Sequence, residues 1–158
     1  MQLDAIDHAL LAALQHDARQ TNRELAAAAH VSPSTSSHRL QALRHNRVIR
    51  GYHADVDPAA LGRHVQALTA VTIRPPSRRN HDSFRTWAAS LPEVISVFAV
   101  AGRDDYLLHL AVADTTALYT FMVDRITERD DVADFHTSVV YEHIRRPTLS
   151  PVKPTTER

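Results

Sequence analysis

The chain has 158 residues, a length that suits one domain or two small domains sharing an interface. Its apolar content of 44% and charged content of 23% are ordinary for a globular protein, and the absence of cysteine excludes disulfides and thiolate metal or redox sites. The N-terminus lacks the basic and apolar regions of a signal peptide, and no apolar run is long enough to span a bilayer. We therefore expect a cytoplasmic protein with no membrane partner.

The formal net charge is zero, but the charges are unevenly distributed. No acidic residue occurs between Glu24 and Asp55. The same window holds a group of arginines and histidines: Arg39, Arg44, Arg47, Arg50, His38, His45 and His53. A locally basic segment favours phosphate binding, although a solvated helix face explains the charge pattern equally well.

Three short helices are predicted in the first part of the chain. The first is indicated by an apolar stripe at helical spacing: Leu3, Ile6, Leu10 and Leu14. Thr21 and Glu24 match a capping box, which predicts a second helix over 22–30. The pair Ser32-Pro33 is a second start signal, because Ser is a preferred N-cap and Pro suits the first helical position, and it predicts a third helix to about His45.

The pattern then changes to a period of two, which predicts a connecting strand over 48–56. Beyond a short linker, strands and helices alternate in the order β-α-β-β-α-β, which is the ferredoxin-like arrangement. The predicted fold class is therefore α+β, with an N-terminal three-helix helix-turn-helix domain and a C-terminal ferredoxin-like domain. The predicted divisions are helix-turn-helix 1–50, connecting strand and linker 51–64, effector-binding and oligomerisation domain 65–146, and tail 147–158.

Both faces of the predicted strands are apolar. Val97 and Ala99 on one face alternate with Phe98 and Val100 on the other. The predicted helices cover only one face of the sheet. We expect a second sheet to cover the other face, and a homodimer supplies one most simply.

Two short helices joined by a tight turn predict a helix-turn-helix, whose second helix enters the major groove of double-stranded DNA. The outward face of this helix carries hydroxyl, imidazole, amide and guanidinium groups, which suit phosphates and base edges. The predicted DNA-binding residues are Ser32, Ser34, Thr35, Ser37, His38, Arg39, Gln41 and Arg44. Among them, Arg39 is expected to contact a phosphate. The alternative is a three-helix bundle with a serine-rich solvent face.

Short motifs follow one another along both predicted domains. In the first domain they are Leu3-Asp4-Ala5-Ile6-Asp7, Leu14-Gln15-His16-Asp17-Ala18-Arg19, Glu24-Leu25-Ala26 and Val31-Ser32-Pro33-Ser34. Further along they are Val48-Ile49-Arg50-Gly51-Tyr52, Asp57-Pro58, Leu91-Pro92-Glu93-Val94 and Gly102-Arg103-Asp104-Asp105-Tyr106. In this order and spacing, the chain from Leu3 to about Ile144 resembles the Lrp/AsnC (feast/famine) family of transcriptional regulators.

The resemblance implies a homodimer built through the C-terminal sheets, often assembled further into a tetramer or octamer. It also implies an amino acid or related small-molecule effector. By position it assigns the effector-binding residues to a glycine-containing loop and the last strand: Gly102, Arg103, Asp104, Asp105, Thr137 and Ser138. Asp105 can pair with an ammonium group and Arg103 with a carboxylate. An ordinary hairpin turn is the alternative for the loop.

Three positions depart from the family pattern. Arg47 stands where the family usually has glycine, which removes a left-handed helix cap. Ser36 occupies a position that is more often apolar, and Asp104 stands where an aromatic or other acidic residue is more common. These departures leave the fold intact.

The sequence also permits functions other than ligand-controlled regulation. The eleven histidines are dispersed without a close ligand set, so no metal, cofactor or catalytic residue is expected. Sirohaem decarboxylases resemble this two-domain layout, and His109, His136 and Arg103 would then serve tetrapyrrole chemistry. A ligand-independent architectural DNA-binding protein is the third possibility.

Overall fold

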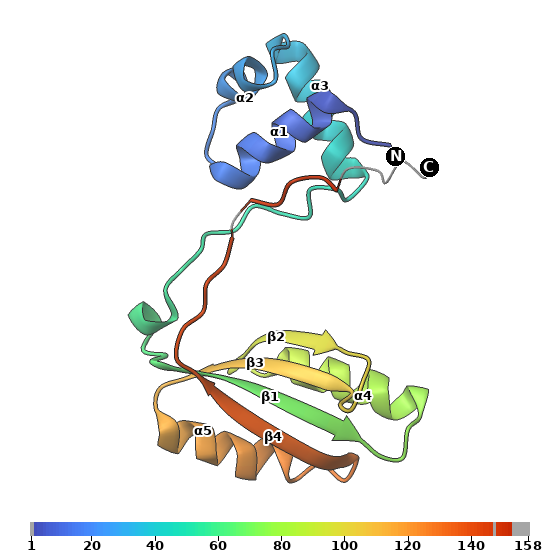
Figure 1. The fold of residues 1–158 in the computed structure, drawn as a ribbon, viewed down its shortest axis with the longest axis vertical. Helices are drawn as coiled ribbons and strands as arrows, with labels where there is room; N and C mark the ends of the chain where they lie inside the picture. Colours follow the sequence, from blue (N-terminus) through green and yellow to red (C-terminus); the bar gives the residue numbers. More distant parts are fainter. Residues whose placement is uncertain (1, 147, 153–158) are drawn as a thin grey trace, which may run out of the picture. The chain divides into compact units, whose positions relative to one another are not determined.

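The structure, a computed structural model, describes residues 2–146 and 148–152 and divides the chain into two compact units (Figure 1). The first unit comprises the residues up to Ala54 together with those from Ile144 onward. The second unit comprises Asp55–His143. The first unit is therefore discontinuous in sequence.

The predicted tail lies partly outside the described residues, namely at residues 147 and 153–158. In its described part, the main chain of Leu149 pairs with the side-chain amide of Gln15 at the end of the first helix. The amide donates to the Leu149 carbonyl at 3.2 Å and accepts from the Leu149 N–H at 2.8 Å. This reciprocal pair joins the two sequence segments of the first unit.

Three helices form the first unit, as predicted: α1 (Ala5–His16), α2 (Asn22–Ala28) and α3 (Pro33–His45). Each begins after a residue whose side chain accepts a hydrogen bond from a backbone N–H of the first turn, and these residues are Asp4, Thr21 and Ser32. Helix α2 ends before the predicted His30, because that residue adopts a left-handed φ of 54°. Leu10 and Leu25 are buried between the helices.

The end of α3 corrects one expectation. Arg47 does not abolish the left-handed cap but adopts that conformation itself, with a φ of 56°. The turn is closed by the Val48 N–H, which donates to the Leu43 carbonyl at 2.9 Å. A left-handed conformation costs a residue other than glycine about 1–2 kcal/mol, and the chain tolerates this cost here.

The predicted connecting strand over 48–56 is wrong. Residues 50–57 have no regular secondary structure, and the next element is the short 3₁₀ helix η1 (Pro58–Leu61). A strand is stabilised by hydrogen bonds to a neighbouring strand, and no strand pairs with this segment within the described chain. Alternating apolar residues alone do not make a strand.

The second unit has the predicted ferredoxin-like order. Its elements are β1 (Val65–Ile73), α4 (Arg78–Ser90), β2 (Val94–Ala99), β3 (Tyr106–Val112), α5 (Thr115–Phe121), the π-helical turn η2 (Met122–Ile126) and β4 (Val132–Val140). The sheet is antiparallel with strand order β2-β3-β1-β4, so β1 pairs with both β3 and β4.

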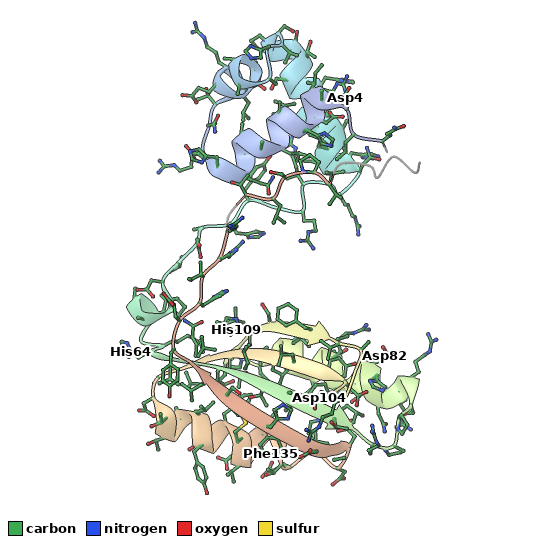
Figure 2. All side chains as sticks on the ribbon, viewed as in Figure 1. Asp4, His64, Asp82, Asp104, His109 and Phe135 are labelled. Atoms are coloured by element: carbon green, nitrogen blue, oxygen red, sulfur yellow. The ribbon has the colours of Figure 1, made fainter. Side chains whose placement is uncertain are left out.

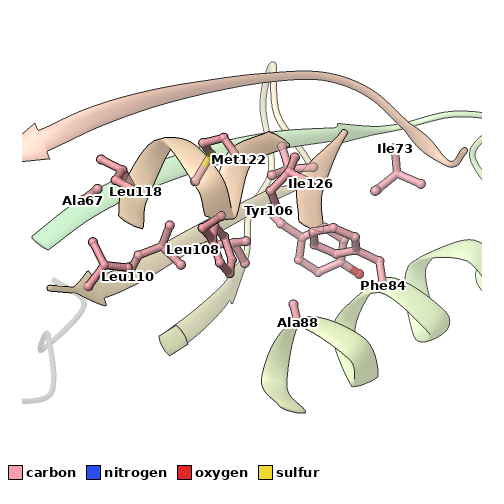
Figure 3. Close-up of a cluster of buried hydrophobic side chains, with 13 residues drawn as sticks. Ala67, Ile73, Phe84, Ala88, Tyr106, Leu108, Leu110, Leu118, Met122 and Ile126 are labelled. Carbon is pink, nitrogen blue, oxygen red and sulfur yellow. The ribbon is translucent and has the colours of Figure 1, made fainter. Parts of the chain in front are cut away.

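Helices α4 and α5 pack on one face of this sheet. Figure 3 shows Phe84 and Ala88 of α4 and Leu118 of α5 gathered with Leu108 of β3. Phe84 is fully buried, and its ring lies 4.8 Å from the ring of Tyr106. The hydrophobic core of the second unit therefore lies between the sheet and its two helices.

The opposite sheet face carries a separate row of apolar side chains. The register places Phe98 of β2 opposite Leu107 of β3, which in turn lies opposite Ala70 of β1. Alternation along each strand points these side chains away from α4 and α5. The Phe98 residue is 49% exposed, so this face is apolar and open to solvent in the single chain.

Ser36 of α3 lies in the buried layer of the first unit. It is fully buried, and its hydroxyl has no hydrogen-bond partner among the described residues. A buried hydroxyl that loses its water without gaining a partner destabilises the folded state.

We expect Ser36→Ala to raise the free energy of unfolding by about 1 kcal/mol more than Ser37→Ala does. Both changes gain the same helix propensity of about 0.5 kcal/mol, but Ser37 is exposed. Urea unfolding followed by circular dichroism measures both variants. Equal gains, or a loss for Ser36→Ala, would mean that the Ser36 hydroxyl is satisfied.

Candidate DNA-binding surface and ligand site

Most predicted DNA-binding residues lie on the exposed surface of α3. The exposed set is Ser34, Thr35, Ser37, His38, Gln41 and Arg44, and the N-cap Ser32 is exposed as well. Positions 34, 37, 41 and 44 follow one another at intervals of three or four, and position 38 lies four residues after 34 and three before 41, which places all five on one side of a helix. The structure therefore brings these residues onto one surface, which contains no acidic side chain because α3 has none.

The hydroxyl groups at the start of α3 are held by one another. The Ser32 Oγ accepts from the Thr35 N–H at 3.2 Å and lies 2.9 Å from the Ser34 Oγ and 2.8 Å from the Thr35 Oγ1. The Asn22 side chain at the start of α2 donates to the Pro33 carbonyl at 2.8 Å. The first turn of α3 is thus fixed by hydrogen bonds before any ligand binds.

Arg39 is placed differently from its neighbours. Its Nη1 lies 2.7 Å from the Asp4 carboxylate and 3.3 Å from both carboxylate oxygens of Asp7. These aspartates are the N-cap and the third residue of α1. The guanidinium for which the sequence predicts a phosphate contact is therefore paired with two carboxylates inside the first unit.

Two carboxyl groups at helix starts have lowered pKa values. The pKa of Asp4 lies below its ordinary 3.8, first because it accepts from the Asp7 N–H and then because of Arg39. The pKa of Glu24 lies below 4.5 because it accepts from the N–H and hydroxyl of Thr21. At pH values above its ordinary pKa, a carboxyl group with a lowered pKa stabilises the folded state. This stabilisation is lost as the pH falls through the lowered pKa.

The predicted ligand loop joins β2 to β3. Gly102 has a φ of 141°, which side-chain-bearing residues rarely adopt. The Asp105 carboxylate accepts from the Ile73 N–H at 2.7 Å and lies 3.5 Å from Arg74. Asp105 therefore anchors the loop to the end of β1 through its Oδ2 atom.

The remaining loop side chains lie beside β4. Asp104, labelled in Figure 2, lies 3.8 Å from the His136 ring nitrogen Nδ1 and 3.5 Å from the Thr72 hydroxyl. Arg103 is exposed and lies 3.8 Å from Asp134. A surface of mixed charge therefore surrounds Gly102.

The two predicted residues on β4 point to opposite faces of the sheet. Thr137 faces the helices, where its hydroxyl lies 2.9 Å from that of Thr69. Ser138 follows it on the open face, opposite Leu68. The expectation that both lie at the loop is corrected for Thr137, because neighbouring residues of a strand cannot line the same face.

The effector-binding set predicted from the sequence omits two residues of β4 that lie at the loop, Asp134 and His136, and His136 is named from the sequence only for tetrapyrrole chemistry. The register pairs them with Thr72 and Ala70 of β1. Their period-two spacing with Ser138 was the available signal. The register of the sheet, which the sequence does not display, was also needed.

The histidines considered for tetrapyrrole or metal chemistry have separate partners. His109 lies 2.9 Å from the Gln66 side chain, and its ring meets that of His143 edge-on at 5.5 Å. Burial, and secondarily His143, lowers the pKa of His109. His136 instead faces Asp104. Within residues 2–146 and 148–152, no three potential metal-ligating side chains lie together, and no helix is long and apolar enough to cross a membrane.

Known proteins resemble the chain over both units. The family model of the AsnC-type helix-turn-helix domain matches residues 3–44, and that of the Lrp/AsnC ligand binding domain matches residues 66–149. The HTH-type transcriptional regulator AldR of Mycolicibacterium smegmatis is 40% identical over 143 residues, which cover 90% of this chain and 84% of AldR.

Two solved structures extend the comparison. A transcriptional regulator of Neisseria meningitidis in complex with L-Met has a TM-score of 0.86 and 32% identity, covering 96% of this chain and 97% of the other. Escherichia coli AsnC has a TM-score of 0.84 and 25% identity, covering 96% and 100%. These relatives are regulators by name, and they match the DNA-binding and ligand-binding units together. The chain therefore belongs to the Lrp/AsnC family and is a DNA-binding transcriptional regulator with a ligand-binding domain.

Proposed function

We propose that α3 reads double-stranded DNA in the major groove through its exposed side. The main support is the row of exposed polar side chains on α3, which contains no acidic residue and begins at the hydrogen-bonded first turn of the helix. His38 and Gln41 suit base edges, since imidazole and amide groups both donate and accept hydrogen bonds. Ser32, Ser34, Thr35 and Ser37 permit close approach, and Arg44 pairs with a phosphate. This regulator acts in the cytoplasm, and it is not an enzyme.

The ligand of the second unit is, in this proposal, an amino acid or a related small molecule. The support is the matched ligand-binding domain and the L-Met complex of the Neisseria meningitidis relative. Arg103 is exposed and suits a carboxylate, while Asp104 suits an ammonium group. Gly102 allows the backbone to approach the ligand, and Ser138 lies farther along the same sheet face as His136.

The open sheet face is the proposed dimer surface. Phe98, Leu107 and Ala70 form an apolar row across that face, which two copies bury by stacking their sheets. Dimers of this kind assemble further into a tetramer or octamer. Phe98 and Leu107 lie close to the two ends of the ligand loop, so ligand and partner copy meet the same sheet face.

The DNA proposal is tested by fluorescence anisotropy on two duplexes. One is selected by the wild-type protein from a random pool, and the other is its scramble. We expect Gln41→Ala and His38→Ala each to weaken binding to the selected duplex by about tenfold, since a base contact contributes about 1–3 kcal/mol, with little effect on the scramble.

The contribution of charge is tested by comparing Arg44→Ala with the control variant Arg85→Ala. Arg44→Ala should weaken binding to both duplexes and reduce the slope of log affinity against log salt by about 0.9, because one phosphate contact is lost. Arg85 is exposed on α4, and its removal should change neither. No binding to either duplex at low salt would contradict DNA reading by α3.

The ligand proposal is tested by isothermal titration with L-methionine and then with the other common amino acids. We expect Arg103→Ala and Asp104→Asn each to weaken binding at least about tenfold, because each removes one charged partner of a zwitterion. Arg78→Ala, an exposed control on α4, should bind as wild type does. Unchanged binding in Arg103→Ala would place the ligand elsewhere, and no heat with any amino acid would indicate a ligand-independent regulator.

The dimer proposal is tested by sedimentation velocity. We expect wild type to sediment as a dimer or larger species and Phe98→Asp to sediment as a monomer, because a charge would be buried in the apolar interface. Tyr119→Asp changes an aromatic residue of α5 that is 70% exposed and should leave the dimer intact. Wild-type sedimentation of Phe98→Asp would exclude this sheet face as the interface.

A further inference from the structure

We propose that Arg39 is a positioning residue, which sets the placement of α3 against α1 through Asp4 and Asp7 and makes no DNA contact of its own. The inference rests on the proposed reading of DNA by α3 and adds the device that holds this helix in its reading position. It reverses the expectation drawn from the charge of Arg39.

The carboxylate partners of Arg39 are themselves rigidly placed. The Asp4 Oδ1 accepts from the Asp7 N–H at 3.0 Å, and the Asp7 Oδ2 accepts from the Asp4 N–H at 3.1 Å. This reciprocal capping box fixes both side chains at the start of α1. Arg39 therefore binds two acceptors whose positions are determined by the backbone of another helix.

Burial makes the contact to Asp7 costly to lose. The Asp7 side chain is 1% exposed, and a buried carboxylate needs a cationic partner to offset its lost hydration. Arg39 is the basic side chain that the structure places on it, at 3.3 Å. One guanidinium nitrogen, Nη1, makes the contacts to both Asp4 and Asp7. A lysine ammonium is one bond closer to the backbone than this nitrogen, so it reaches the two carboxylates less well.

The same pairing makes Arg39 a poor phosphate ligand. Its single positive charge faces two carboxylates, and its pKa is raised first by the hydrogen bond to Asp4. A phosphate would have to compete with both aspartates for the guanidinium. Arg44, five residues farther along α3, is exposed and forms no salt bridge within the described residues, so it is the matched control.

Placement of α3 matters more for base reading than for general DNA affinity. Hydrogen bonds to base edges require side chains within about 0.5 Å of the productive geometry. Contacts to phosphates depend on long-range charge and tolerate small shifts. Loss of the Arg39 contacts should therefore reduce discrimination between sequences and spare non-specific binding.

The test compares Arg39→Ala, Arg39→Lys, Asp7→Asn and Arg44→Ala with wild type, in the full chain, on the selected and scrambled duplexes over a salt series. We expect Arg39→Ala to lose about tenfold on the selected duplex and at most about twofold on the scramble, with an unchanged salt slope. Asp7→Asn, which alters a residue hidden from DNA, should reproduce this selective loss. The double variant Arg39→Ala/Asp7→Asn should lose little more than either single variant, because both remove one interaction.

Arg39→Lys keeps the positive charge. It replaces Arg39→Ala in the test if thermal unfolding shows that Arg39→Ala does not fold. A phosphate contact would survive this change, whereas the positioning role predicts weaker binding to the selected duplex with the scramble unaffected. Equal losses on both duplexes with a slope reduced by about 0.9 in Arg39→Ala, as expected for Arg44→Ala, would overturn the proposal. Full discrimination in Arg39→Ala or in Arg39→Lys would overturn it too, while wild-type failure to bind either duplex would overturn DNA reading by α3 itself.

Discussion

The alternation of side chains along β1 determines the placement of everything else in the second unit. Ala67, Thr69, Val71 and Ile73 are fully buried beneath the helices, while the intervening residues face the other way. Because β1 lies between β3 and β4, its register decides which residues of both neighbours meet α4 and α5 and which form the open face. The position of the ligand loop also depends on β1. The Asp105 N–H donates to the Val71 carbonyl, and the Asp105 carboxylate accepts a hydrogen bond from the Ile73 N–H.

Helix capping determines where the acidic side chains of the first unit lie. The acids Asp4, Asp7 and Glu24 are placed where orphan N–H groups need acceptors. The α3 helix instead uses the uncharged Ser32 as its cap. Its outer surface therefore stays free of negative charge, and a chain of zero net charge presents a face suited to a polyanion.

Local rules in the sequence predicted the elements that depend on local contacts. The helix starts at Thr21 and Ser32 followed from capping chemistry, and the ferredoxin-like order followed from the alternation of apolar patterns. The segment 48–56 failed because strand formation depends on a neighbour, which no local pattern reports. Ser36 stood out in the sequence as a polar residue at an apolar position, and its burial explains why apolar residues suit that place.

The candidate sites were harder to predict because their residues serve two purposes. Arg39 and Asp105 have the charges that DNA and amino acids need, but the fold uses both for internal contacts at sequence separations of 32 or more. Thr137 shows the same limit, since its partner Thr69 lies on another strand. Sequence shows which chemistry a residue has, and the three-dimensional neighbours decide whether that chemistry is still free.

The reciprocal hydrogen bonds between Gln15 and Leu149 affect the order in which the protein is built. Synthesis runs from the N-terminus, so the three helices leave the ribosome long before Leu149 does. During that interval water takes the place of Leu149 at the Gln15 amide, and the ligand-binding unit can fold. The helices of the DNA-binding unit are synthesised first, but this unit therefore completes its contacts later than the ligand-binding unit does.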